Sequence, residues 1–247
     1  MYKSLKKAVL ALAVASTLVS SIAMAEGVPM DGNPANGKQI FMNGKGPVVA
    51  CMTCHGPTGW GTEAMGAPRL ANLGYPYIVK QLTDLAEGRR VPQGAGAVMP
   101  YFASQLTPQE RKDIAAYVNT LNTTPELSDI KEIQSSGQPV GVRYKGEILV
   151  KYGVENKVSA CVSCHGYNGR GAPPMFPVIG QQKFTYLVNQ LHNWRDGSRA
   201  NDPLGMMRAI AKNLSDQDIL DAATYLSSAP RTTQGGSDYT SFSPKTQ

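Results

Sequence analysis

The sequence lacks the short motifs that mark nucleotide-dependent enzymes and common nucleophilic catalysts. It has no dinucleotide-binding GxGxxG fingerprint and no Walker loop for phosphates. No serine, threonine or cysteine sits in a pattern that pairs a nucleophile with a catalytic base. These absences argue against a nucleotide-dependent enzyme and leave the chain without a recognisable catalytic set.

A concentrated excess of positive charge is also missing. The chain holds 24 lysines and arginines against 18 acidic side chains, but three of the lysines lie within the first 25 positions. The remaining 21 basic and 18 acidic residues give a net charge of only +3. Nucleic-acid-binding proteins typically show a basic patch or stripe. We therefore expect no nucleic-acid partner.

Long hydrophobic runs are absent except near the N-terminus. Three lysines precede a mostly apolar or small segment, residues 8–22, and residues 23–25 (Ala-Met-Ala) have the small-x-small form of a signal-peptidase site. The segment is short for a membrane span, which needs about 20 predominantly apolar residues. We predict a cleavable signal peptide over 1–25 and an exported protein beginning near Glu26; an uncleaved anchor is the alternative.

Cysteine and histidine are scarce, with four and three residues respectively, yet all four cysteines and two histidines fall in two copies of one pattern. The copies are Cys51-Met-Thr-Cys54-His55 and Cys161-Val-Ser-Cys164-His165. The cysteines of the second copy follow those of the first by 110 positions. Other matching residues, such as Tyr77 and Tyr186, are 109 positions apart, and a few pairs are 108 apart. A register this constant predicts two homologous domains.

Strands are not expected, because no segment shows a comparable alternation of apolar and polar residues. Each copy instead has a short opening helix, a middle helix with an apolar stripe, and a last helix that begins at a predicted capping box. The boxes start at Thr107 and Ser215, and the middle helices run into Gly88 and Gly197. The fold class is therefore all-α.

The domain boundaries follow from the repeat and from composition. We predict an N-terminal domain over 26–122 and a C-terminal domain over 144–230. Residues 123–143 are rich in Thr, Ser, Pro, Gly and charge and are typical of a surface linker. Residues 231–247 lack an apolar face and are expected to be a disordered tail.

The two Cys-x-x-Cys-His motifs admit four interpretations. A structural zinc site made by all four cysteines is disfavoured because Cys54 and Cys161 are 107 positions apart. A thioredoxin-like redox pair expects a strand–helix–strand context, which is absent. A disulfide suits an exported protein but gives no role to the histidine that follows each second cysteine.

Covalent haem attachment accounts for every part of the motif. Two thiols on one helical turn can each add to a haem vinyl group, and the adjacent imidazole then ligates the iron. The haem would also supply an apolar plate for a domain whose own core is thin. The sequence thus predicts two haem c groups, bound through Cys51, Cys54, Cys161 and Cys164, with His55 and His165 as iron ligands.

The second axial ligand decides the chemistry of each iron, and Met99 and Met207 are the candidates. Met99 follows a glycine-rich stretch and stands seven residues before Leu106, which immediately precedes the last helix. Met207 stands seven before Leu214, and this register favours it over the neighbouring Met206. His/Met ligation fills both axial positions, so the iron is left with the transfer of single electrons.

Residues around the motifs are expected to play supporting roles. The remaining histidine, His192, lies off the apolar stripe of its helix and is predicted at the surface. Met65 and Met175, each eleven residues after a second cysteine, are predicted to pack in the core. A carbonyl at Pro68 or Pro177 could accept the Nδ1–H of its histidine; the alternative is a proline that only shapes the loop.

At these residues the chain resembles class I cytochromes c, and its tandem arrangement is similar to the dihaem cytochrome c4 family. In the second copy the resemblance is carried by Cys-x-x-Cys-His-Gly, "FPVIGQQ", "GSRANDPLGMM" and "LSDQDILDAATYLSS". In the first it is carried by "CMTCHGP", "APRL", "EGRR", "VMP" and "LTPQERKDIAAYV". The first copy departs from the pattern over residues 68–73, where "PRLANL" stands in place of a sequence with Gly-Gln after Pro-x-Leu-x.

This resemblance implies two tandem class I cytochrome c domains, each built around one covalently bound haem c, with the haems facing each other across the interface. It implies a periplasmic electron carrier rather than an enzyme. Its partners would be other redox proteins: a quinol-linked or dehydrogenase donor and an oxidase or reductase acceptor. Peripheral membrane association is left open.

Two alternative functions fit the same motifs. One is the dihaem subunit of an oxidoreductase complex, similar to the cytochrome partner of flavocytochrome c sulfide dehydrogenase. The other is a dihaem enzyme, such as a peroxidase or a thiosulfate-oxidising cytochrome. The enzyme would require one iron with an open position or with a ligand other than methionine.

Overall fold

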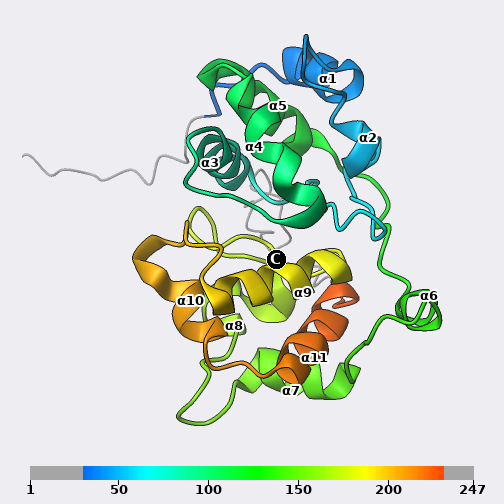
Figure 1. Ribbon diagram of the computed structural model, residues 1–247, viewed down its shortest axis with the longest axis vertical. Coiled ribbons are helices and arrows are strands. Elements are labelled where there is room, and N and C mark those ends of the chain that lie inside the picture. Colours follow the sequence, from blue (N-terminus) through cyan, green and yellow to red (C-terminus); the bar gives the residue numbers. More distant parts are fainter. Residues whose placement is uncertain (1–29, 231–247) are drawn as a thin grey trace, which may run out of the picture.

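The computed structural model describes residues 30–230, and within them all regular structure is helical apart from isolated β-bridges. Figure 1 shows two halves stacked along the long axis of the molecule, with the N-terminal half above the C-terminal half. The all-α prediction is therefore confirmed. No helix in this part of the chain is long and apolar enough to cross a bilayer. The predicted signal peptide and the predicted C-terminal tail lie outside the described residues.

The two halves present the same α-helices in the same order, and the C-terminal half has one additional 3-10 helix, η2 (Tyr167–Gly169). The N-terminal half contains α1 (Pro34–Asn43), α2 (Met52–His55), α3 (Tyr75–Ala86), the 3-10 helix η1 (Gly94–Val98), α4 (Met99–Ser104) and α5 (Pro108–Thr120). The C-terminal half contains α7 (Arg143–Tyr152), α8 (Val162–His165), the 3-10 helix η2 (Tyr167–Gly169), α9 (Phe184–Asp196), the 3-10 helix η3 (Pro203–Gly205), α10 (Met206–Ala211) and α11 (Asp216–Ser227).

The helix ends follow the sequence signals closely. Thr107 caps α5 and Ser215 caps α11, each through a complete capping box with the acid three residues later. The middle helix α9 ends at Gly197, whose φ of 81° is a left-handed conformation that glycine adopts without strain. Local hydrogen bonding thus fixes where the predicted helices begin and end.

The opening and closing helices of each half cross at very short range. A Cβ atom placed on Gly37 of α1 would lie 1.9 Å from the Asp113 carbonyl oxygen of α5. The same construction at Gly146 of α7 gives 1.9 Å to the Asp221 carbonyl oxygen of α11. Only glycine allows the two backbones to approach this closely. Cys51 and Cys161, at the start of each Cys-x-x-Cys-His turn, pack against the apolar cluster that contains residues of these crossing helices.

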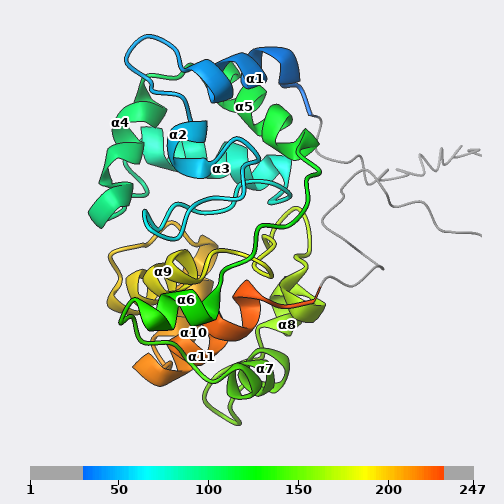
Figure 2. The same cartoon turned by 90° about the vertical axis from the view of Figure 1, so that its right-hand side faces the viewer.

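The segment predicted as a surface linker carries a helix of its own, α6 (Ile130–Ser135). Asp129 caps its first turn by accepting hydrogen bonds from the Lys131 and Glu132 backbone N–H groups. Ile133 is buried in the apolar cluster of the C-terminal half. Figure 2 shows α6 lying against the lower half of the molecule. The connection is therefore partly docked on the C-terminal half.

Candidate functional site

Each Cys-x-x-Cys-His motif forms a single helical turn. The turns are α2 and α8, and Cys51 and Cys161 are their N-cap residues. All four thiols are free, with no disulfide among them. Both imidazoles at the ends of these turns are nearly fully buried, with His55 6% exposed and His165 7% exposed. The turn thus directs the thiols and the imidazole from one short piece of backbone.

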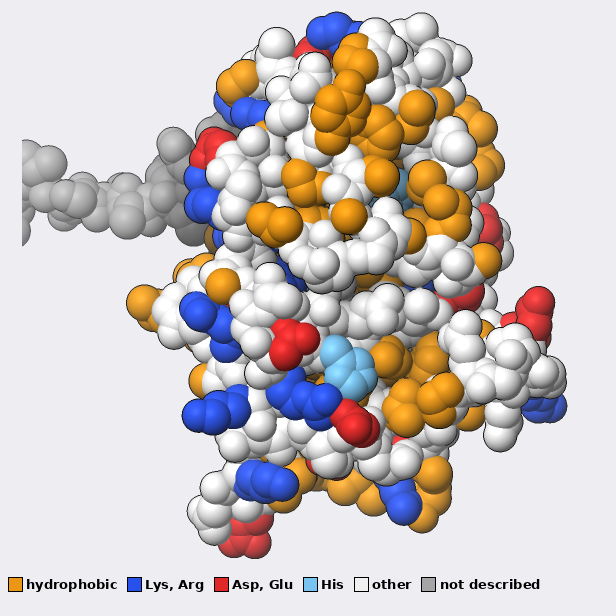
Figure 3. Space-filling view, viewed as in Figure 1, with side chains coloured by type: hydrophobic (Ala, Val, Ile, Leu, Met, Phe, Trp, Pro, Cys, Tyr) orange, Lys and Arg blue, Asp and Glu red, His pale blue; other side chains and the backbone are white. Residues whose placement is uncertain are grey.

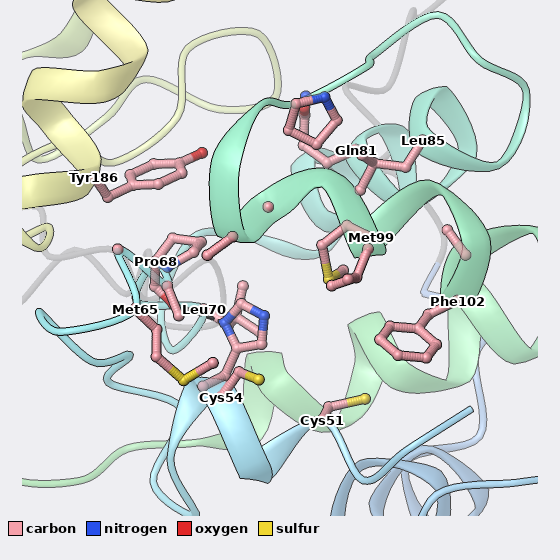
Figure 4. A pocket seen from close by; sticks show the side chains of 18 of the residues that line it. Cys51, Cys54, Met65, Pro68, Leu70, Gln81, Leu85, Met99, Phe102 and Tyr186 are labelled. Atoms are coloured by element: carbon pink, nitrogen blue, oxygen red, sulfur yellow. Dashed lines mark hydrogen bonds between the residues drawn. The ribbon is translucent and has the colours of Figure 1, made fainter. Parts of the chain in front are cut away.

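In the N-terminal half this turn faces a cavity of about 540 Å³. Figure 4 shows Cys51 and Cys54 on one side of the cavity and Met99, at the start of α4, extending into it from across. His55 also lines the cavity, and most of the remaining lining is aliphatic or aromatic. Tyr186, from the C-terminal half, closes one side. The structure therefore gathers every predicted haem-binding residue of the first copy around one space.

The buried imidazoles are oriented by backbone carbonyls. The Nδ1 atom of His55 lies 2.9 Å from Pro68 O, and that of His165 lies 2.8 Å from Pro177 O. A carbonyl can only accept, so Nδ1 carries the proton and donates it, which leaves Nε2 available as a ligand. Burial lowers the pKa of both histidines and outweighs the opposing effect of these hydrogen bonds. The two imidazoles are thus held neutral.

The first cysteine of each motif has a thiol that ionises less readily than usual, whereas Cys164 is exposed. Burial raises the pKa of Cys51 to about 11 and that of Cys161 to about 11. Zinc binding and thiol–disulfide exchange both require the thiolate. Within the described residues no three cysteine, histidine or acidic side chains cluster in a way that could hold a metal ion. The zinc and thioredoxin-like interpretations are not supported by this arrangement.

Met99 and Met207 stand at the same distance from a buried alanine in α4 and α10, although the first residue of α4 is Met99 and the first residue of α10 is Met206. Each methionine stands one helical turn before a fully buried alanine, Ala103 in α4 and Ala211 in α10. In both helices this alanine accepts the backbone hydrogen bond that ends the turn, from Leu106 and Leu214 respectively. Met206 stands one position further from the buried alanine. Counted back from the buried alanine, Met207 is the residue that matches Met99, as it is in the sequence repeat.

Two of the supporting predictions change on inspection of the structure. Met65 and Met175 do not pack in the core; their exposed fractions are 45% and 62%, and Met65 lies at the rim of the cavity. Their loops run along the surface beside the motif, so the prediction from sequence distance alone was wrong.

His192 lies half-exposed on α9 beside Arg195 and is not among the cavity residues, as predicted.

A second set of functional residues, missed by the sequence analysis, lies between the halves, where α3 and α9 face each other (Figures 1 and 2). The Arg90 guanidinium donates to Gln81 of its own half and to Tyr186 and Gln190 of the other. Arg199 repeats this pattern in reverse. It donates to Gln190 of its own half and to Tyr77 and Gln81 of the other. The six residues form three pairs, and the two members of each pair are 109 positions apart in the sequence. The internal repeat could therefore have identified them as a set.

These two arginines are buried, at 8% and 6% exposure for Arg90 and Arg199, and neither forms an ion pair with a described residue. Burial raises the pKa of Tyr186, but the two guanidinium groups outweigh it and lower that pKa. Arg90 Nε, at the edge of the cavity, has no hydrogen-bond partner. Such a buried excess of positive charge matches an anionic ligand.

Haem fits this site on each count. The cavity is largely apolar, two thiols stand on one turn at its wall, and a neutral imidazole and a thioether reach it from different elements. The propionate groups of haem match the Arg90 guanidinium, which lines the cavity and has no carboxylate partner in the described part of the chain. A helical domain with covalently attached haem, present twice in one chain, defines the class of the c-type cytochromes.

Comparisons with known proteins agree. A sequence model of the cytochrome c family matches residues 34–122 and 153–230. Cytochrome c4 from Thiocapsa roseopersicina is 38% identical over 202 residues, which cover 79% of this chain and 97% of that protein. The chain belongs to the cytochrome c family and is a dihaem, cytochrome c4-like member that binds two covalent haem c groups and transfers electrons.

Two further relatives are connected with thiosulfate oxidation. A thiosulfate dehydrogenase electron acceptor from Stutzerimonas stutzeri (strain A1501) is 33% identical over 198 residues, which cover 79% of this chain and 87% of that protein. The solved thiosulfate dehydrogenase from Marichromatium purpuratum matches with a TM-score of 0.69 at 30% identity. The match covers 82% of this chain but 40% of the other, so this chain spans less than half of that protein.

Proposed function

We propose that the protein is a periplasmic carrier of single electrons, in which His55 and Met99 ligate one iron and His165 and Met207 ligate the other. The observation that carries the proposal is the cavity that brings Cys51, Cys54, His55 and Met99 together. The same motif, buried imidazole and methionine-bearing helix recur in the C-terminal half.

The proposed ligand set explains why electron transfer is the chemistry. Bound haem supplies an iron that gains and loses one electron. His55 with Met99 and His165 with Met207 would hold the two irons, and the burial of each imidazole would keep water and substrates away from the metal. The Pro68 and Pro177 carbonyls fix each ring, so little has to move when the charge changes. The described residues thus support outer-sphere transfer.

The rim of the N-terminal cavity offers a surface for redox partners. Val49, Val98 and Met65 line the cavity and are 51%, 49% and 45% exposed. Figure 3 shows hydrophobic side chains gathered over this upper half, whereas charged side chains are more frequent over the lower half. A largely uncharged rim suits brief contacts with several redox proteins. The donor would be a quinol-linked enzyme or dehydrogenase, and the acceptor an oxidase or reductase.

The test is a redox titration of the purified holoprotein, followed optically and by electron paramagnetic resonance. The expected result is two haems per chain, each low-spin with the signature of His/Met ligation and each titrating with one electron. A high-spin haem, or one with His/His ligation, would contradict the proposed ligands. Fractionation of the source cells, with sequencing of the mature N-terminus, tests the periplasmic location.

A second candidate is the electron acceptor of a thiosulfate dehydrogenase, favoured by the relative from Stutzerimonas stutzeri and by the larger enzyme from Marichromatium purpuratum. Gel filtration of native extract distinguishes a free carrier, which elutes near its own mass, from a subunit bound to an enzyme. Rapid reduction by a thiosulfate dehydrogenase with thiosulfate, but not by thiosulfate alone, would favour this candidate.

A further inference from the structure

We propose that Gln182, in the C-terminal half, is a positioning residue that lowers the reduction potential of the haem in the N-terminal half. It acts on the ligand His55 through one peptide group, the one that joins Pro68 to Arg69. The other haem lacks an equivalent residue, so the two potentials are set apart by this contact. The inference rests on the proposed ligation of iron by His55 and His165.

The contact is a continuous chain of hydrogen bonds across the boundary between the halves. His55 Nδ1 donates to Pro68 O at 2.9 Å, and the N–H of the same peptide group, on Arg69, donates to Gln182 Oε1 at 2.6 Å. The Gln182 amide also donates from Nε2 to Arg69 O at 3.0 Å. Gln182 is 3% exposed, so water does not compete for these bonds.

The direction of the effect follows from the polarisation of the peptide. An acceptor on the N–H side makes the carbonyl oxygen more negative, and this strengthens the bond that it accepts on the other side. A stronger acceptor at Nδ1 makes the imidazole a better electron donor to iron. Ferric iron gains more from such a ligand than ferrous iron. Gln182 therefore shifts the N-terminal haem toward the oxidised state.

The C-terminal half has the first bond of this chain but not the second. His165 Nδ1 donates to Pro177 O at 2.8 Å, much as in the other half. Across the described residues, however, no group accepts a hydrogen bond from the Val178 N–H. The position that matches Gln182 in the repeat is Leu73, a buried residue of the same apolar cluster as Val178. Leucine has no acceptor to offer.

The first experiment replaces Gln182 with leucine, the residue that stands at the matching position. A redox titration followed by the paramagnetic NMR signals of each haem reports the two potentials separately. In Gln182→Leu we expect the potential of the N-terminal haem to rise, with about a threefold larger reduced-to-oxidised ratio at a fixed applied potential, the lower end of what one hydrogen bond contributes. The C-terminal haem should stay as in the unmodified protein.

The reciprocal variant Leu73→Gln supplies an acceptor near Val178. It should lower the potential of the C-terminal haem and leave the N-terminal haem unchanged. Gln181→Leu is the matched control, because this neighbouring buried glutamine donates to Ala229 O and touches neither peptide group. It should move neither potential. General damage to the interface cannot produce shifts of opposite sign at different haems.

An unchanged N-terminal potential in Gln182→Leu would overturn the proposal, as would equal shifts of both haems. If Gln182→Leu does not fold, Leu73→Gln decides: a C-terminal potential that stays the same or rises refutes the mechanism. Failure of the proposed ligation would be seen separately, as a high-spin or non-methionine spectrum in the unmodified protein. The exchange rate of the His55 Nδ1 proton, expected to increase in Gln182→Leu, gives a readout independent of electron transfer.

Discussion

His55 and His165 are each fixed at both ends, by a helical turn at the backbone and by a proline carbonyl at Nδ1. The ring therefore cannot rotate to offer the other nitrogen. Because burial also lowers the pKa of both histidines, each imidazole is neutral and ready to ligate. The common turn of the cysteines and the histidine could be predicted from the motif alone, since these residues are adjacent in sequence. The proline carbonyls lie 13 and 12 residues further on, and the sequence left them as one of two alternatives.

The methionine side of the site depends on contacts that the sequence shows only indirectly. Met206 and Met207 are neighbours, and both are partly buried. Counted back from the buried Ala211, Met207 is the residue that matches Met99, so Met207 stays the predicted ligand. The repeat register gave the same preference for Met207.

We expect Met207→Leu to convert half of the haem to a high-spin form that binds added cyanide, because one of the two irons loses its thioether. Met99→Leu should give the same result at the other iron. Met206→Leu is the control and should leave both low-spin spectra unchanged. Optical and electron paramagnetic resonance spectra of the three variants check this. A high-spin haem in Met206→Leu alone would exchange the roles of the two neighbours.

Asp113 should contribute stability that depends on pH. It accepts hydrogen bonds from the Asn33 backbone N–H at 2.7 Å, from Asn36 at 2.7 Å and from Gln109 at 2.9 Å. Burial raises the pKa of Asp113, but these donors outweigh it and lower the pKa below its ordinary value of about 3.9. The stabilisation is therefore complete above that value and is lost as the pH falls through the lower, folded-state pKa.

In Asp113→Asn, the new amide turns a donor toward groups that already donate. We expect the free energy of unfolding at neutral pH to fall by about 1–3 kcal/mol. As the pH falls below about 4 the difference between the variant and the unmodified protein should shrink, and it should vanish only below the lowered, folded-state pKa, where the unmodified carboxylate becomes protonated. Denaturant unfolding at a series of pH values measures both effects. A constant difference between the two proteins at every pH would contradict the assignment.

At the scale of helices, the crossing of α1 with α5 and of α7 with α11 is the most demanding contact. Gly37→Ala and Gly146→Ala each place a methyl group against a backbone carbonyl that cannot move aside. We expect each to reduce the free energy of unfolding by about 1–3 kcal/mol, the usual cost of overpacking. The higher helix propensity of alanine, up to about 1 kcal/mol, should not compensate.

Lys38→Ala and Lys145→Ala are matched controls on the exposed faces of the same helices. They should change the stability by less than about 0.5 kcal/mol. Thermal and denaturant unfolding of the four variants gives the comparison. If the glycine variants were as stable as the lysine variants, the close crossing described above would be incorrect.

The helices that the sequence predicted are those with a complete local signal. The closing helices had capping boxes and apolar periodicity, and the middle helices had an apolar stripe with a glycine stop. The helix α6 was not predicted, because it spans six residues and only Ile133 in it is buried. Its stability comes from docking on the C-terminal half. Short helices held by tertiary contact leave little periodicity to detect.

At the scale of the molecule, a carboxylate from one half caps a helix of the other. Glu63 accepts hydrogen bonds from the Phe184 N–H at 3.1 Å and the Thr185 N–H at 3.0 Å, at the start of α9, and from the Ser128 hydroxyl. A sequence analysis within either copy could not find this cap, because the carboxylate and the helix are more than 100 residues apart. The same holds for the buried arginines.

We expect Glu63→Ala to reduce the free energy of unfolding by about 0.5–2 kcal/mol, the range for loss of a helix cap. Hydrogen exchange in the first turn of α9 should accelerate, although the mutation lies in the other half. Glu87→Ala is the control, because Glu87 is exposed and pairs only with Arg89 at the surface. Exchange that accelerates only around residue 63 would show that the cap does not connect the halves.

The contact between the halves is self-complementary, since each gives the other the same arginine, glutamine and tyrosine that it receives. Two molecules that exchanged halves through an extended connection would keep each of these contacts. The upper half of one chain would dock on the lower half of a second, and the reverse, giving an intertwined pair of double mass with unaltered haem spectra. Refolding from concentrated solution is where such a pair would accumulate.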